Sequence, residues 1–114
     1  MATFSIYARE TLIGHSLLEA GDPFMGVASG VFLPAPDYEL VKNECRCNHA
    51  DQSHLDLSAR SETGLEIPCL CVSVLDYSLE MDESFIEVNV MGIAGSLYTE
   101  LFPQHVESYR QKFK

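Results

Sequence analysis

Short segments in which apolar and polar residues alternate limit what this chain can fold into, because a period of two residues is typical of half-buried β-strands. In the clearest segment, residues 85–91, three branched apolar residues alternate with two polar ones: Ile86, Val88 and Val90 against Glu87 and Asn89. Similar patterns predict strands over residues 3–8, 11–18, 26–33, 55–59 and 67–75. Turn-forming residues at 21–23 and 61–64 separate several of these strands.

Prolines mark where the predicted helices begin. Pro36, followed by acidic residues, predicts a short helix to about Lys42, and residues 44–53 are expected to be irregular. Near the end of the chain, Ser96 is expected to cap a helical turn and Pro103 to begin a final helix. Because too few long helices intervene to make parallel crossovers, we expect an α+β fold: a mostly antiparallel sheet of five or six strands with a short mid-chain helix and a C-terminal helix.

The length and composition of the chain fit one domain spanning residues 1–114. Hydrophobic residues make up 46% of its 114 residues, which is enough for a single core. No apolar run approaches the roughly 18 residues that a membrane span requires, and no basic, apolar leader begins the sequence. We therefore expect a cytoplasmic protein whose four cysteines stay reduced.

The charge of the chain is strongly negative and unevenly distributed. Asp and Glu number 17 against seven Lys and Arg, giving a net charge of −10, and the 49 residues between Arg60 and Arg110 contain no Lys or Arg. Such a surface repels nucleic acids and anionic membranes, which need basic residues to bind. It attracts a basic protein or peptide. The leading hypothesis is therefore a cytoplasmic protein-interaction module, although the acidity alone also explains solubility.

The acidic residues Glu80, Asp82, Glu83 and Glu87 are the candidates for contact with such a partner. The first three lie between two predicted strands, where the simpler interpretation is a solvated hairpin loop. The calcium-binding loop pattern is absent from this segment. A homodimer formed through an exposed sheet edge stays open as a further possibility, because edge strands invite pairing.

A cluster of cysteine and histidine residues gives an alternative from a different class. Cys45, Cys47, His49 and His54 carry the side chains that zinc prefers, so a metal-binding or thiol-dependent small enzyme is conceivable. The spacing is not that of a standard zinc finger, and an extended segment would spread the first three residues over roughly 13 Å. The simpler interpretation is unliganded thiols, with Cys69 and Cys71 as small apolar core residues and no cofactor.

Two segments, GDPFMGVASGVF at residues 21–32 and LYTELFPQHV at residues 97–106, resemble small bacterial proteins of unassigned function. Small acidic bacterial domains of this kind are sometimes immunity proteins, which neutralise a basic toxin. The resemblance thus implies an immunity-type inhibitor as one concrete form of the interaction module. It implies no catalytic residues. The glycines at 26 and 30 do not form a phosphate-binding loop and instead predict a bulge or a close backbone approach.

Overall fold

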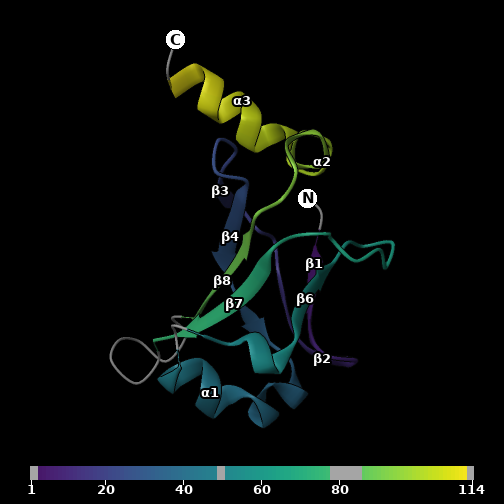
Figure 1. Cartoon of the computed structure of the whole chain (residues 1–114), viewed down its shortest axis with the longest axis vertical. Helices are drawn as coiled ribbons and strands as arrows, with labels where there is room; N and C mark the ends of the chain where they lie inside the picture. Colours follow the sequence, from purple (N-terminus) through teal and green to yellow (C-terminus); the bar gives the residue numbers. More distant parts are fainter. Residues whose placement is uncertain (1–2, 49–50, 78–85, 113–114) are drawn as a thin grey trace.

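Eight short strands and three α-helices make up the part of the chain that the computed structural model describes, residues 3–48, 51–77 and 86–112 (Figure 1). The strands are β1 (Phe4–Ala8), β2 (Thr11–Ser16), β3 (Ala20–Asp22), β4 (Val27–Val31), β5 (Leu33–Pro34), β6 (Leu57–Arg60), β7 (Cys71–Asp76) and β8 (Ile86–Met91). The helices are α1 (Lys42–Cys47), α2 (Gly95–Leu101) and α3 (Pro103–Lys112), with the 3-10 turns η1 (Pro36–Leu40) and η2 (Ser53–Leu55).

The strands form two antiparallel sheets of four strands each. Their orders are β5-β2-β1-β6 and β3-β4-β8-β7. The predicted α+β class and antiparallel pairing are therefore confirmed, whereas five or six strands in one sheet is too few. The two extra strands have distinct origins. Residues 20–22 pair with β4 although a turn was predicted at residues 21–23, and the predicted strand over 26–33 divides into β4 and β5.

The division between β4 and β5 occurs at Phe32, where one extended segment passes from one sheet to the other. The backbone N–H of Phe32 still donates to the carbonyl of Ile86 in β8, at 2.9 Å, while the following residue, Leu33, pairs with His15 in β2. The Phe32 side chain is fully buried, and its ring occupies the space that a Cβ at Gly14 would need. The continuous segment of β4, Phe32 and β5 therefore belongs to both sheets and contributes Phe32 to the core that they share.

The helices lie at opposite ends of the molecule (Figure 1). Helices α2 and α3 sit beyond the end of β3 and β4, and Tyr98 and Phe102 from this pair are fully buried. Helix α3 begins at Pro103 as predicted, but Ser96 does not cap α2, whose N-cap is Ala94 without a side-chain hydrogen bond. None of the helices in the described part of the chain combines the length and apolar character that crossing a bilayer requires.

The mid-chain region is more helical than expected. The predicted helix is a 3-10 turn, Pro36–Leu40, and α1 follows over Lys42–Cys47, where an irregular segment was predicted. The buried Asp76 at the end of β7 accepts a 2.5 Å hydrogen bond from the hydroxyl of Tyr38, and Arg46 of α1 lies 3.7 Å from the same carboxylate. This carboxylate joins both helical segments to the sheet.

Strand β7 lies at the edge of its sheet, and a side chain forms hydrogen bonds with its outward-facing backbone groups. The buried Gln52 donates from Nε2 to the carbonyl of Val74, at 2.8 Å, and its Oε1 accepts the Val74 N–H, at 2.9 Å. The side-chain amide thus replaces a neighbouring strand at this point, which removes an exposed site for edge pairing.

Replacing this amide tests its contribution. Gln52→Ala leaves both backbone groups of Val74 without their partners, so the free energy of unfolding should fall by about 2 kcal/mol. Urea denaturation followed by circular dichroism measures the change. Gln111→Ala, at an exposed position of α3, is the matched control and should change the free energy of unfolding by less than about 0.5 kcal/mol. Equal effects of the two substitutions would contradict this role for Gln52.

Candidate functional site

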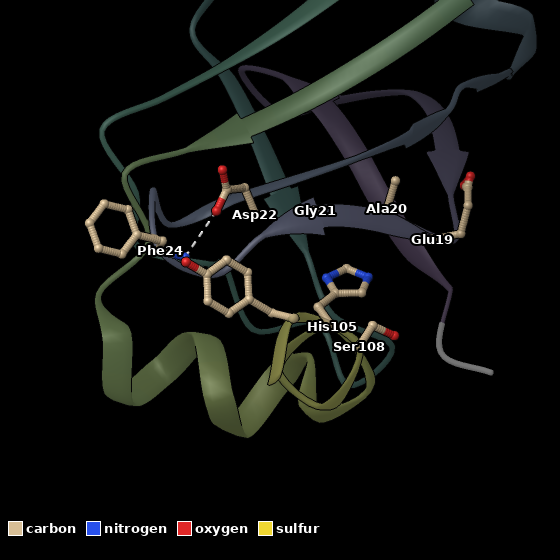
Figure 2. A pocket seen from close by; sticks show the side chains of 8 residues that line it. Glu19, Ala20, Gly21, Asp22, Phe24, His105 and Ser108 are labelled. Carbon is tan, nitrogen blue, oxygen red and sulfur yellow. Dashed lines mark hydrogen bonds between the residues drawn. The ribbon is translucent and has the colours of Figure 1, made fainter. Parts of the chain in front are cut away.

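Two adjoining pockets flank the short edge strand β3. The β3–α3 pocket, of about 540 Å³, lies between β3 and the last helix and is lined by Glu19, Ala20, Gly21, Asp22, Phe24, His105, Ser108 and Tyr109 (Figure 2). The β3–β8 pocket, of about 340 Å³, is lined by Glu19, Ala20, Ser29, Gly30, Val31, Ile86 and Glu87. The two pockets share Glu19 and Ala20, and the surface that they make up together beside β3 is called the groove below.

Three carboxylates, those of Glu19, Asp22 and Glu87, line this groove. Glu19 accepts the backbone N–H of Val31 with both carboxylate oxygens, at 3.2 and 3.1 Å, where β4 extends past the end of β3. Asp22 Oδ1 accepts the backbone N–H of Phe24 at 3.1 Å (Figure 2). A carboxylate can accept about four hydrogen bonds, so both groups are held in place by the backbone and keep free lone pairs.

His105 forms part of the wall of the β3–α3 pocket and is 6% exposed. Its Nδ1 lies 2.9 Å from the hydroxyl oxygen of Tyr98, and that hydroxyl lies 2.8 Å from the carbonyl of Val27. Its Nε2 is fully buried, and the ring lies against the backbone of Leu18 and Glu19. Burial lowers the pKa of His105, and hydrogen bonding of the ring to the backbone of Glu19 and Leu18 opposes this only in part. The imidazole is therefore neutral at pH 7.

Gly21 allows the helices to approach β3 this closely. A Cβ at this position would overlap the hydroxyl of Tyr98 and lie 2.7 Å from both Nδ1 of His105 and the carbonyl oxygen of Val27. Residues 21–32 and 97–106 thus pack against each other at this point. Close backbone approach is also confirmed at Gly26, which has a φ of +68° and lies against the carbonyl of Ile93.

Of the four acidic residues predicted to contact a partner, the structure locates one. Glu87 is half-buried on β8 and lines the β3–β8 pocket. Glu80, Asp82 and Glu83 lie outside the described residues. The other described carboxylates of residues 61–109, apart from the buried Asp76, are spread over the turn after β6 and over α2 and α3: Glu62, Glu66, Glu100 and Glu107.

The residues of the predicted cysteine and histidine cluster do not lie together, because two of them are on different faces of helix α1. Cys45 is fully buried and Cys47 is exposed, because residues two positions apart on a helix face different directions. His54 lies 3.2 Å from the carboxylate of Glu44, and His49 is outside the described residues. Within the described ranges, no three His, Cys, Asp or Glu side chains are grouped so as to hold a metal ion. A zinc site that includes His49 stays a prediction.

The thiols differ in their surroundings. Burial, the largest effect, raises the pKa of Cys45 to about 12, although its hydrogen bond with Tyr38 acts in the opposite direction. A buried thiol with a raised pKa is a poor nucleophile. Cys69 is half-buried, whereas Cys71 is exposed on β7, so the expectation that both are core residues is wrong for Cys71.

Sequence reasoning found Glu87 but missed Glu19, Asp22 and His105. Residues 19–22 and 105 are far apart in the sequence, and only the packing of α3 against β3 brings them together. Residues 21–32 and 97–106, which contain Asp22 and His105, contact each other only in the folded chain. No protein-family model matches the chain, and neither curated proteins nor solved structures yield a match.

The different exposure of the thiols predicts their reactivity. With iodoacetamide at pH 8 under native conditions, Cys47 and Cys71 should be alkylated and Cys45 should be protected, since alkylation requires an accessible thiolate. Peptide mass spectrometry after a short exposure measures the modification at each site. Denatured protein, in which all four cysteines react, is the control. Preferential modification of Cys45 would instead support a thiol-dependent activity.

Burial of neutral His105 predicts a loss of stability in acid. The lowered pKa means that the unfolded chain takes up a proton that the folded protein resists, so this contribution is complete above the unfolded pKa of about 6.5 and falls as the pH drops below it. The free energy of unfolding should decrease more between pH 7.5 and pH 5 in the wild type than in His105→Asn. Urea denaturation at both pH values gives the comparison, and identical decreases would count against a buried neutral imidazole.

Proposed function

We propose that this protein is an acidic interaction module that binds a basic protein or peptide along the groove beside β3. The observation that carries the proposal is the convergence of Glu19, Asp22 and Glu87 on two adjoining pockets. The first two precede or belong to β3, and the third belongs to β8. Glu87 is also one of the four acidic residues that the sequence indicates as candidates for partner contact, and it lines the β3–β8 pocket.

The distribution of the cations supports the same function. Three of them are near carboxylates of this chain: Lys42 with Glu39 at 3.4 Å, Arg46 with Asp76 at 3.7 Å and Arg60 with Glu10 at 3.7 Å. These contacts neutralise none of the carboxylates that line the groove. With a net charge of −10, the field around the molecule attracts a basic partner from a distance. The same field disfavours nucleic acids and anionic membranes.

An immunity-type inhibitor of a basic toxin in the cytoplasm is one concrete form of this module. Inhibitors of this class act by binding, so the proposal requires a shaped acidic surface and no catalytic group. The alternative of a metal-binding or thiol-dependent enzyme gains no support from the described residues, because Cys45 is buried while Cys47 and His54 are exposed. Pairing of two copies through β7 would have to displace the side chain of Gln52.

The salt dependence of association tests the proposal. The immobilised protein is incubated at low ionic strength with an extract of the cells that produce it, and a captured protein is identified, purified and returned for kinetic measurement. We expect a basic partner whose association rate falls by about ten-fold or more between 50 and 500 mM NaCl, since charge attraction drives the encounter. Capture of no basic protein, or association that is insensitive to salt, contradicts the proposal.

Charge-neutralising variants locate the contact surface. Glu19→Gln and Glu87→Gln remove one negative charge each from the groove, and Glu39→Gln removes the same charge from η1, outside both pockets. The groove variants should weaken affinity for the captured partner by about ten-fold, and the control by less than two-fold, because only contacting charges lose a hydrogen-bonded partner. Equal effects of all three variants would show that only net charge matters and that the groove is not the contact.

A further inference from the structure

We propose that the basic partner adds an extended segment to the open edge of β3, where this segment pairs with the backbone of Gly21. This inference deepens the function proposed above and rests on it, because it concerns the same groove and specifies how a partner fits there. In strand addition, backbone hydrogen bonds hold the added segment in one register, and alternate side chains give specificity.

The pairing of β4 with β8 determines which backbone groups of β4 face β3. The N–H of Phe32 donates to the carbonyl of Ile86, so residues 28 and 30, in the same register, also direct their N–H and C=O groups to β8. The intervening residues of an antiparallel strand face the opposite side. Accordingly, the N–H of Val31 donates to the carboxylate of Glu19 on the β3 side.

Gly21 is the residue of β3 whose backbone points away from the sheet. Its neighbours Ala20 and Asp22 lie opposite residues 29 and 27, which face β3 and hold them by hydrogen bonds. Gly21 lies opposite Ala28, which faces β8, so the N–H and C=O of Gly21 are directed to the open edge. All three residues of β3 are exposed, and neither of these Gly21 groups has a hydrogen-bond partner among the described residues.

The other sheet edges in the described part of the chain are covered or shortened. Gln52 occupies the edge of β7 at Val74. Beside β6 the chain returns, and the N–H of Ile67 donates to the carbonyl of Ala59 at 2.8 Å. Strand β5 has two residues, and the second, Pro34, has no N–H to donate. An uncovered edge such as that of β3 is where an extended chain can add.

The β3–α3 pocket provides space for the added segment. This pocket of about 540 Å³ has Gly21 and Asp22 of β3 on one side and Ser108 and Tyr109 of α3 on the other. Figure 2 shows Ala20, Gly21 and Asp22 along one strand, with Ser108 on the helix beside it. Three residues of extended chain cover roughly 10 Å, so a short segment is enough to span β3.

The two faces of the added segment meet different surroundings. A Cβ at Gly21 would point at the hydroxyl of Tyr98 and at Nδ1 of His105, so a side chain opposite Gly21 is directed toward these buried rings, which favour an uncharged residue. The adjacent side chains point to the other face, where Asp22 lies, because strand residues alternate. Directly opposite Cβ atoms are about 5 Å apart, so a lysine or arginine there reaches the Asp22 carboxylate. The preferred segment is thus an uncharged residue between basic ones.

Charge favours a basic partner over a second copy of this chain at the same edge. Two copies that paired through β3 would bring the carboxylates of Glu19 and Asp22 from both copies to one contact, and each copy has a net charge of −10. Like charges opposite each other on paired strands are destabilising. A basic segment replaces this repulsion with attraction while it forms the same backbone hydrogen bonds.

Nuclear magnetic resonance of the ¹⁵N-labelled protein tests the pairing. In the free protein, the amide hydrogen of Gly21 should exchange freely with water, and those of Ala20 and Asp22 should exchange more slowly. The probe is the acetylated and amidated peptide Lys-Val-Lys-Val-Lys. It should shift the Gly21 amide resonance with saturation and slow its exchange at least about five-fold, because the amide gains a hydrogen bond.

A second peptide separates backbone pairing from charge attraction. Methylation of the backbone nitrogen of both valines keeps the charges and side chains but removes the N–H groups that would donate to Gly21. This peptide should bind at least about five-fold more weakly. Equal binding of the two peptides overturns the proposal. So does a slowly exchanging Gly21 amide in the free protein, or a Gly21 amide that the first peptide leaves unprotected.

A charge variant tests the contact with Asp22. Asp22→Asn keeps the acceptor for the Phe24 N–H and removes the charge, so it should weaken binding of the first peptide by about five-fold. Asp37→Asn, at an exposed position of η1 outside both pockets, is the matched control and should change binding less than about two-fold. Equal effects refute the contact. If Asp22→Asn does not fold, the comparison of the two peptides on the wild type decides.

The result is distinguishable from failure of the proposed function. If the peptide protects Gly21 but no basic protein is captured, the edge accepts a strand and the interaction module is wrong. If a captured basic partner leaves the Gly21 amide exchanging freely, the module stands and strand addition is wrong. A protein that dimerises without peptide and protects Gly21 in the dimer assigns the edge to a second copy, and this outcome also overturns the proposal.

Discussion

The passage of one extended segment between two sheets at Phe32 is the constraint on which the rest of the structure depends. Residues before it pair with β8 and residues after it pair with β2, so one continuous segment belongs to both sheets. The Phe32 ring fills the space above Gly14 and lies 5.1 Å from the ring of Tyr38, centroid to centroid. A larger residue at Gly14 would clash with the Phe32 ring and with the carbonyl of Leu33. The other end of β4 pairs with β3, and α3 packs against β3.

Several buried polar groups in the described part of the chain join neighbouring elements of the fold. Asp76 accepts from Tyr38, Gln52 forms two hydrogen bonds with Val74, and the hydroxyl of Ser16 accepts the N–H of Leu18. Each of these contacts holds a helix, a loop or a strand end against a sheet.

Local patterns predicted the strands well because the period of two residues reports directly on burial. All six predicted strands overlap an observed strand, and Pro103 begins the last helix. Two features were not predicted because they depend on tertiary contacts between segments that are distant in the sequence. Residues 20–22 look like a turn, yet pairing with β4 makes them a strand, and the apolar pattern continues through Phe32 although the pairing partner changes there. The site was found only at Glu87, since no local pattern places residue 105 beside residue 21.

The groove differs from the rest of the acidic surface in how its carboxylates are held. Glu19 is fixed by the N–H of Val31 and Asp22 by the N–H of Phe24, whereas Glu107 sits on the exposed face of a helix. A carboxylate already held by the backbone loses less conformational entropy on binding than a mobile one. The total charge therefore attracts a basic partner at long range, and the carboxylates that the backbone holds in place determine where on the surface the partner binds. A partner selected in this way would be recognised by the spacing of its basic side chains and not by its charge alone.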